Sequence, residues 1–235
     1  MNIAHMNWFQ VESYLEHDNR VVLPIGSTEQ HAYLSLCTDY TLSSKLAETA
    51  GKRCNVPVYP GLPYGVAPYF SAFPGTVTIR PAIYRELLVD IVSSLVGSGF
   101  TRILMVNGHG GNSHVAEHLT RWCQENAPHC QLIFHDWWAS RRVMKAVHAI
   151  STNASHASWM ENFPWTRIEG VQVPAQEKAA SDVTTIQHLT PKEVKAYIGD
   201  GNYGGYYEVS DEAMEEIWRI AEDEVTEILE TGWSA

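Results

Sequence analysis

Long apolar runs are missing from this sequence, and cysteine is scarce. No stretch of eighteen apolar residues occurs, whereas a transmembrane helix needs about twenty. The four cysteines show no C-x-x-C spacing, which argues against a disulfide framework or a thiolate zinc site and fits reduced thiols. We therefore expect a cytoplasmic protein without a membrane partner.

Basic side chains are also few. The chain carries 16 Lys and Arg against 27 Asp and Glu, a formal net charge of −11, and shows no basic cluster. Nucleic acids and anionic membranes bind clustered basic side chains, so neither is expected as a partner. With 45% hydrophobic residues and no internal repeat, the chain can bury a sizeable core. We predict a single domain over residues 1–235.

Segments with strand character alternate with segments of helical character. Short apolar runs predict strands at Val21–Ile25, Val56–Tyr59, Arg102–Val106 and Gln131–Phe134. Apolar spacing predicts helices between them, at about 41–54, 82–97 and 113–126. This alternation predicts an α/β fold, a three-layer α/β/α sandwich whose largely parallel sheet has helices on both faces.

The last third of the chain gives three further predictions. Thr190 to Glu193 has the threonine cap, first-turn proline and capping-box glutamate that begin a helix. After Ser210, apolar residues recur at helical spacing above an acidic outer face. Residues 166–182, with a proline at position 174 and little periodicity, predict a long loop that serves as a lid or a subunit contact.

The first predicted strand leads directly into potential metal ligands. Gly26 and Ser27 end the strand. Glu29 and His31 follow two residues apart, so an extended loop turns both side chains to the same side, and Asp39 can close the cluster. Mixed carboxylate and imidazole ligands suit zinc, manganese or ferrous iron. Taken alone, the segment is better explained as a polar surface loop, and the rest of the chain has to support a metal site.

A second strand ends in a glycine-rich turn, residues 107–112, with the sequence N-G-H-G-G-N. His109 lies in this turn. Backbone N–H groups of such a turn can instead hold a phosphate, but the spacing matches neither the dinucleotide-binding nor the P-loop pattern and no lysine follows. Ligands of parallel sheets collect at the carboxyl ends of strands, where His109 and the first cluster both fall.

A third cluster contains a histidine and a carboxylate five residues apart, His156 and Glu161, flanked by tryptophan. The alternative here is the start of a helix, with Ser155 as its cap and both other side chains exposed to solvent.

Together these clusters resemble the signatures of the creatininase family of metal-dependent amidohydrolases. The resemblance covers roughly residues 15–230 and rests on five ordered motifs. They are Pro24 to His31 with Thr38-Asp39, Phe73 to Thr76, Asn107 to Asn112, His156-Ala157 with Glu161, and Gly199 to Gly204.

The resemblance implies a centre of two divalent metal ions, zinc, manganese or iron, bridged by Asp39. Glu29 and His109 would complete one metal site, and His31 and Glu161 the other. It also implies a homo-oligomer, since hexamers are common in the family.

Three departures from the family pattern bear on the substrate. The loop between His31 and Asp39 is one residue shorter than usual and lacks a second histidine. Gly111 stands where creatinine-hydrolysing members have a metal-binding glutamate, and Ser155 stands where they have a glutamate before the catalytic histidine. Creatinine itself is therefore not the expected substrate.

Aromatic residues near these motifs are candidates for the substrate pocket. Trp137, Trp138 and Trp159 would form flat walls for a small ring, with Tyr33 and Gly110 as further contacts. The alternative places about half of the tryptophans in the core or a subunit interface. The arginines near the motifs, Arg141, Arg142 and Arg167, are candidates to pair with a substrate but are by default surface residues.

These observations predict a metal-dependent hydrolase of a small cyclic or amide-like compound, in which water activated between two metals cleaves a C–N bond. His156 matches the family's catalytic histidine, which would donate a proton to the leaving group and stabilise charge on the carbonyl. One alternative is ring opening at a C–C bond of a cyclic diketone such as an oxidised inositol. Another is a non-catalytic small-molecule binding protein with the same fold.

Overall fold

The computed structural model describes residues 1–233 and contains one parallel sheet of three strands. The strands are β1 (Arg20–Ile25), β2 (Arg102–Asn107) and β3 (Gln131–Asp136), in the order β1-β2-β3. They pair without offset, so that Arg20 lies beside Arg102 and Arg102 beside Gln131. The carboxyl ends of all three strands therefore meet at one edge of the sheet.

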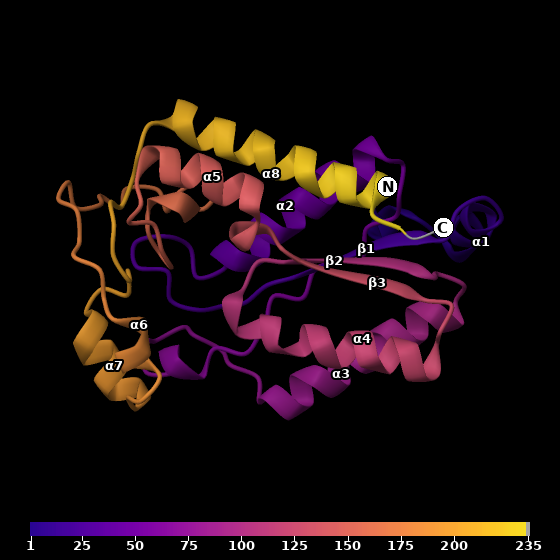
Figure 1. Cartoon of the computed structure of the whole chain (residues 1–235), viewed down its shortest axis with the longest axis horizontal. Coiled ribbons are helices and arrows are strands. Elements are labelled where there is room, and N and C mark those ends of the chain that lie inside the picture. The colour runs from indigo at the N-terminus through magenta and orange to yellow at the C-terminus, as the bar shows by residue number, and fades with distance from the viewer. Residues whose placement is uncertain (234–235) are drawn as a thin grey trace.

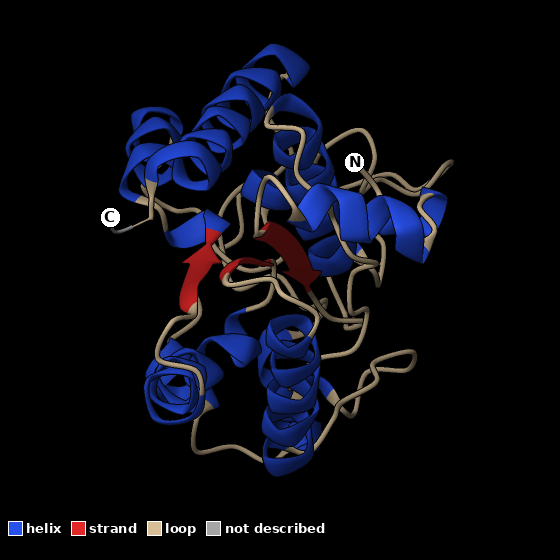
Figure 2. Ribbon diagram, turned by 90° about the vertical axis from the view of Figure 1, so that its right-hand side faces the viewer, coloured by secondary structure: helices blue, strands red, loops and turns tan. Residues whose placement is uncertain are grey.

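Helices connect the strands and cover both faces of the sheet (Figures 1 and 2). The α-helices are α1 (Trp8–Leu15), α2 (Thr38–Arg53), α3 (Pro81–Gly97), α4 (Ala116–Asn126), α5 (Arg141–Ile150), α6 (Val183–Ile186), α7 (Pro191–Ile198) and α8 (Asp211–Thr231). Short 3-10 helices are η1 (Ile3–His5), η2 (Pro68–Phe70), η3 (Gly110–Val115), η4 (Trp137–Ala139) and η5 (Trp159–Glu161).

Alternate residues of the strands supply two separate apolar cores, because neighbouring side chains of a strand point to opposite faces. Val22 and Leu104 face α2, α5 and α8, whereas Leu23 and Ile103 face α3 and α4. Figure 1 shows α2, α5 and α8 on one side of the sheet and α3 and α4 on the other. The predicted α/β/α sandwich with a parallel sheet is confirmed.

The predicted strand Val56–Tyr59 is wrong. Val58 forms only isolated parallel bridges, to Val22 and to Asn2. Pro57 and Pro60 have no N–H groups to donate, so a regular ladder cannot form on both sides of Val58. The segment nevertheless covers the free edge of β1, where the Val22 N–H donates to the Pro57 carbonyl at 3.0 Å.

Other boundaries also differ from expectation. Helix α2 begins at Thr38, so Asp39 lies in the first turn of a helix and not on the return of a loop. The predicted helix over 113–126 is split, because the glycine-rich turn continues as η3 before α4 begins at Ala116. The capping box between Thr190 and Glu193 is present at the start of α7, as predicted.

Residues 166–182 form no helix or extended strand, as predicted, and α8 buries the apolar stripe expected after Ser210. None of the helices within residues 1–233 is both long and apolar enough to cross a membrane.

Candidate metal centre

Five buried side chains, the ones that sequence analysis selected as ligands, converge beyond the carboxyl ends of β1 and β2. Glu29 and His31 follow β1, His109 follows β2, Asp39 lies in the first turn of α2, and Glu161 ends η5. Their ligand atoms form two groups that share Asp39, each within 4.8 Å: one with Glu29 and His109, the other with His31 and Glu161. These are the two sets that the resemblance implied.

Asp39 lies between the two groups and turns one carboxylate oxygen to each. Its Oδ1 lies 2.9 Å from His31 Nε2, and its Oδ2 lies 2.9 Å from His109 Nδ1. The hydroxyl of Ser27 donates to Oδ2 at 2.8 Å. A carboxylate in this position can bridge two cations.

Two glycines allow α2 to bring Asp39 so close to the strand ends. A Cβ atom on Gly108 would lie 2.1 Å from the Asp39 carbonyl oxygen. On Gly26 it would lie 2.4 Å from the backbone nitrogen of Tyr40. Both distances are too short for any side chain, so these glycines are required by close backbone approach.

Backbone carbonyls orient the two imidazoles toward the carboxylates. His31 Nδ1 lies 3.2 Å from the Glu29 carbonyl oxygen, and His109 Nε2 lies 2.9 Å from that of Val66. A carbonyl only accepts, so each of these nitrogens donates its proton. The other nitrogen of each ring faces Asp39, and once it gives up its proton it can bind a cation, as in histidines that bind metals.

Two buried polar atoms in the cluster have no hydrogen-bond partner among the described residues, and a cation would satisfy both. They are Glu29 Oε2 and His31 Nε2. The His31 nitrogen lies within 2.9 Å of Asp39 Oδ1, but the angle does not suit a hydrogen bond. Orphaned buried polar atoms are costly, and here they belong to residue types that bind zinc, manganese or iron. The residues fit a pair of divalent metals.

Burial disfavours charge on every member of the cluster, while acids and imidazoles attract one another. Burial would lower the pKa of His31, but the Asp39 carboxylate raises it to about 10. Burial would also lower the pKa of His109, but the Glu29 and Asp39 carboxylates raise it well above its usual value. Burial would raise the pKa of Asp39, but both imidazoles hold it well below its usual range. Burial raises the pKa of Glu161 to about 7.

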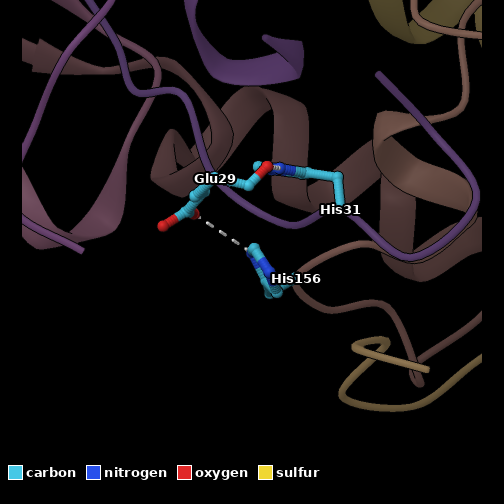
Figure 3. Close-up of side chains that lie close together, drawn as sticks. All are labelled: Glu29, His31 and His156. Carbon is cyan, nitrogen blue, oxygen red and sulfur yellow. Dashed lines mark hydrogen bonds and ion pairs between the residues drawn. The ribbon is translucent and has the colours of Figure 1, made fainter. Parts of the chain in front are cut away.

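His156 lies beside this cluster without belonging to either bridged group. Its Nδ1 lies 3.8 Å from Glu29 Oε1, and Figure 3 shows the carboxylate and the ring approaching each other. The ring stacks on Phe70, with centroids 4.8 Å apart and planes inclined by 12°. Burial, and then the charge of nearby His31, holds the pKa of His156 well below its usual value.

The alternative proposed for the third cluster, a helix start capped by Ser155, is wrong. The Ser155 hydroxyl donates to the Gly204 carbonyl at 2.7 Å, and η5 begins only at Trp159. Glu161 is buried, and its Oε2 accepts a hydrogen bond from the N–H of Ala157 at 2.6 Å.

A cavity of about 690 Å³ opens onto the cluster. Its wall is mostly apolar and aromatic, and includes Val66, Tyr69, Phe70, Trp138, Met144 and Met160. No Lys or Arg is among the described residues that line it. Of the residues selected as substrate contacts, Trp138 and Gly110 line this cavity.

The other three selected contacts lie elsewhere. Trp137 and Trp159 are buried in the core on the α2, α5 and α8 side of the sheet. Tyr33 packs edge-on against Tyr207 and lines a separate hollow beside the long loop. The expectation that these three wall the pocket is therefore corrected, because packing on the core or on the loop turns each side chain away from the cluster.

Two of the three candidate arginines pair with acidic residues outside the cavity. Arg167 donates to Asp211 at 2.6 Å, and Arg142 to Glu227 at 2.5 Å. Both side chains therefore form ion pairs away from the cavity, as expected for surface residues. Phe70 and Tyr203 flank His156 and were not predicted as site residues, although Tyr203 lies in the Gly199–Gly204 motif.

Gly111 leaves no room for the glutamate that creatinine-hydrolysing members have there. A Cβ atom would lie 1.9 Å from the Val66 carbonyl oxygen and 2.5 Å from His109 Nε2. The position of the Val66 carbonyl therefore prevents a side chain at position 111 from serving as a ligand in this chain.

Known proteins resemble this chain in sequence. It is 39% identical over 99 residues to the mycofactocin precursor peptide peptidase of Mycolicibacterium smegmatis, covering 39% of this chain and 40% of that protein. It is 28% identical over 107 residues to the 3-dehydro-scyllo-inosose hydrolase of Thermotoga maritima, covering 45% and 34%. It is 28% identical over 118 residues to the creatinine amidohydrolase of Pseudomonas putida, covering 47% and 45%. The chain thus spans less than half of each relative.

Solved structures resemble the whole chain. A crystal structure of creatinine amidohydrolase superposes with a TM-score of 0.80 at 20% identity, covering 100% of this chain and 98% of that one. A creatininase variant of the Zn-Zn type superposes with a TM-score of 0.79 at 20% identity and the same coverage. At this identity the likeness establishes the fold. The sequence model of the Creatininase family, described as creatinine amidohydrolase, matches residues 4–229, and this chain belongs to that family.

Proposed function

We propose that this protein is a metal-dependent hydrolase that cleaves an amide bond at a pair of divalent cations. One cation would be held by Glu29, Asp39 and His109, and the other by His31, Asp39 and Glu161. The observation that carries the proposal is the placement of Asp39, whose two oxygens each lie 2.9 Å from a different imidazole nitrogen. The structural neighbour of the Zn-Zn type supports a pair of metals.

When bound, two such cations lower the pKa of a shared water and stabilise the oxygens of a tetrahedral intermediate. The remaining task, positioning a hydrogen-bond donor beside the substrate, would fall to residues of the chain itself. Phe70 and Tyr203 hold the ring of His156 beside the Glu29 carboxylate. From there His156 would act on the substrate, as a proton donor to the leaving group or as a donor to the carbonyl oxygen.

The cavity favours an uncharged amide with an apolar flank. A substrate carboxylate or phosphate away from the cations would find no Lys or Arg among the described lining residues. A volume of about 690 Å³ also exceeds what a single small ring fills. Relatives named as a peptidase and as an amidohydrolase are consistent with an amide substrate.

Metal analysis tests the centre directly. After purification with zinc or manganese and removal of free metal, the wild type should retain two ions per chain. Asp39→Asn should lose both ions and turnover, because the bridging oxygen is replaced by an amide nitrogen. Asp90→Asn, the same substitution at an exposed position of α3, is the matched control and should retain both. Full metal content in Asp39→Asn would refute the bridging role.

A second reaction remains in competition because one relative is named as a 3-dehydro-scyllo-inosose hydrolase. Ring opening of a cyclic diketone would use the same cluster but yield a keto acid without nitrogen. Product analysis separates the two reactions, since amide cleavage releases ammonia or a new amine. A chain that retains metals and binds amides without turning them over would instead be the non-catalytic binding protein.

The homo-oligomer implied by the family stays a prediction. Ile168 and Val171 on the long loop expose 46% and 45% of their surface, and a second copy of the chain would cover such apolar side chains. Light scattering measures the mass in solution, and a monomer would contradict the prediction.

A further inference from the structure

We propose that Gln30 is a positioning residue, which fixes the ring of His156 with its proton on Nδ1, so that His156 acts as a hydrogen-bond donor to the substrate oxygen. This inference rests on the proposed hydrolase function of the same site. It assigns a role to two motif segments, Gln30 and the Gly199–Gly204 turn, that the metal ligands do not explain.

The carboxamide of Gln30 can be oriented in only one way. Its Oε1 accepts a hydrogen bond from the N–H of Ala32 at 3.1 Å, and its Nε2 donates to the Gly201 carbonyl at 3.1 Å. Rotating the amide by half a turn would place N–H against N–H and oxygen against oxygen. Gln30 is 4% exposed, so water cannot compensate for such mispairing.

This orientation determines which nitrogen of His156 carries the proton. Gln30 Nε2 lies 2.8 Å from His156 Nε2, and an amide nitrogen only donates. The same nitrogen also lies 3.2 Å from the backbone carbonyl oxygen of Gln30, which only accepts. The amide contact is the shorter of the two, and a proton on Nε2 would place N–H against N–H there, so Nε2 accepts and the proton of the neutral ring lies on Nδ1. Nδ1 is the nitrogen that faces the Glu29 carboxylate, 3.8 Å away (Figure 3).

The backbone turn behind Gln30 is shaped to hold it. Gly201 has a φ of +104°, and a Cβ atom there would lie 1.7 Å from Gln30 Oε1. Asp200 fixes the turn, because it accepts from the N–H of Asn202 at 3.2 Å and from the hydroxyl of Tyr207 at 2.6 Å. Lys178 of the long loop also pairs with Asp200. The turn therefore supports the amide, and the amide supports the imidazole.

The tautomer decides between the two roles that His156 could have. A neutral imidazole that gave up its Nδ1 proton would become an anion beside the Glu29 carboxylate, which is unfavourable. It can instead donate a hydrogen bond to charge that develops on the substrate oxygen, without transferring the proton. We therefore assign charge stabilisation to His156, and the proton that the leaving nitrogen takes up would come from the attacking water.

Nitrogen NMR of the zinc-loaded protein tests the inference without requiring turnover. With ¹⁵N-labelled histidine at about pH 8.5, two units above the ordinary histidine pKa, long-range ¹H–¹⁵N correlations distinguish the two tautomers. The signals of His156 are those lost in His156→Asn. We expect the Nδ1–H form in an excess of about tenfold or more, as one mispaired buried hydrogen bond would shift the equilibrium by that factor.

Variants of Gln30 then show whether its amide is the cause. Gln30→Glu has the same shape but no donor, so His156 Nε2 should gain a proton. Gln30→Met removes both polar atoms and should leave a mixture of tautomers. The matched control is Gln187→Glu, which adds the same charge to the cavity wall and should leave the Nδ1–H form unchanged.

Two results would overturn the inference: an Nε2–H tautomer in the wild type, or a tautomer that does not respond to either Gln30 variant. Zinc content measured on the same samples keeps the proposed function separate. A protein that binds no zinc but shows the predicted tautomer contradicts the metal centre and leaves the role of Gln30 in place.

Discussion

Replacing Gly111 by alanine should weaken metal binding, although no ligand is changed. The added Cβ atom would lie 1.9 Å from the Val66 carbonyl oxygen and 2.5 Å from His109 Nε2. These two atoms form the hydrogen bond, 2.9 Å long, that orients His109. The close neighbour is backbone and not the end of a flexible side chain, so the strand-end turn must shift.

The size of the effect follows from the bond that is lost. Removing the partner that orients a metal-binding histidine lowers metal affinity by about 10- to 100-fold. Leaving a buried carbonyl unsatisfied also costs about 1 to 3 kcal/mol of folding stability. Gly111→Glu should be no better, because its Cβ meets the same obstacle before the carboxylate can reach a cation.

Gly110→Ala is the matched control, one residue away in the same 3-10 helix. A Cβ atom there would meet only Trp138, at an ordinary contact distance of 3.8 Å. Competition with a chelator gives the zinc affinity of both variants and the wild type, and thermal melting gives their stability. Equal zinc affinity in Gly111→Ala and Gly110→Ala would refute the claim that the contact between His109 and Val66 prepares the centre.

Two further predictions address the core and the charge of the cluster. Trp159→Ala should cost about 3 to 5 kcal/mol of stability in denaturant unfolding, as for other buried aromatics, whereas Trp138→Ala should cost far less and alter substrate binding; equal losses would contradict their assignment to core and cavity. Because the pKa of His31 is raised to about 10 and that of His109 is also raised, both rings hold a proton in the metal-free protein at neutral pH. Zinc must displace these protons, so its affinity should rise with pH. Calorimetry in buffers of different ionisation heat measures the protons released, and a value of zero would contradict the prediction.

The ligands could be predicted from the sequence because their signal is local. Glu29 and His31 directly follow a buried strand, and His109 directly follows its neighbour in the sheet. The rule that parallel strands bring their carboxyl ends to one edge is then enough to place these side chains together. Asp39 was expected to close the cluster from the return of a loop, and its position in a helix turn was not foreseen.

The pocket wall could not be predicted in the same way. Trp137 and Trp138 are adjacent in η4, yet one packs in the core and the other lines the cavity. Which of two neighbouring tryptophans faces inward depends on the direction in which a single 3-10 turn leaves β3, and composition does not encode that direction. Tyr33 was misplaced for a similar reason, because Ala32 adopts a φ of 50° and turns the chain away from the cluster.

The ligands have a local sequence signal and the pocket wall does not, which explains why the metal centre is better defined than the substrate. Four of the five candidate ligands follow strand ends or lie in the first turn of α2, and close backbone contacts at Gly26 and Gly108 fix that turn against the strand ends. Part of the cavity wall, including Phe70 and Trp138, comes from η2, η4 and α6, short elements whose directions depend on tertiary packing. A change of substrate within this fold therefore requires only new short connections, whereas a change of metal centre requires a new fit between α2 and the sheet. A ligand at position 111 would require a further shift, of the Val66 backbone, which occupies the space that a side chain there would need.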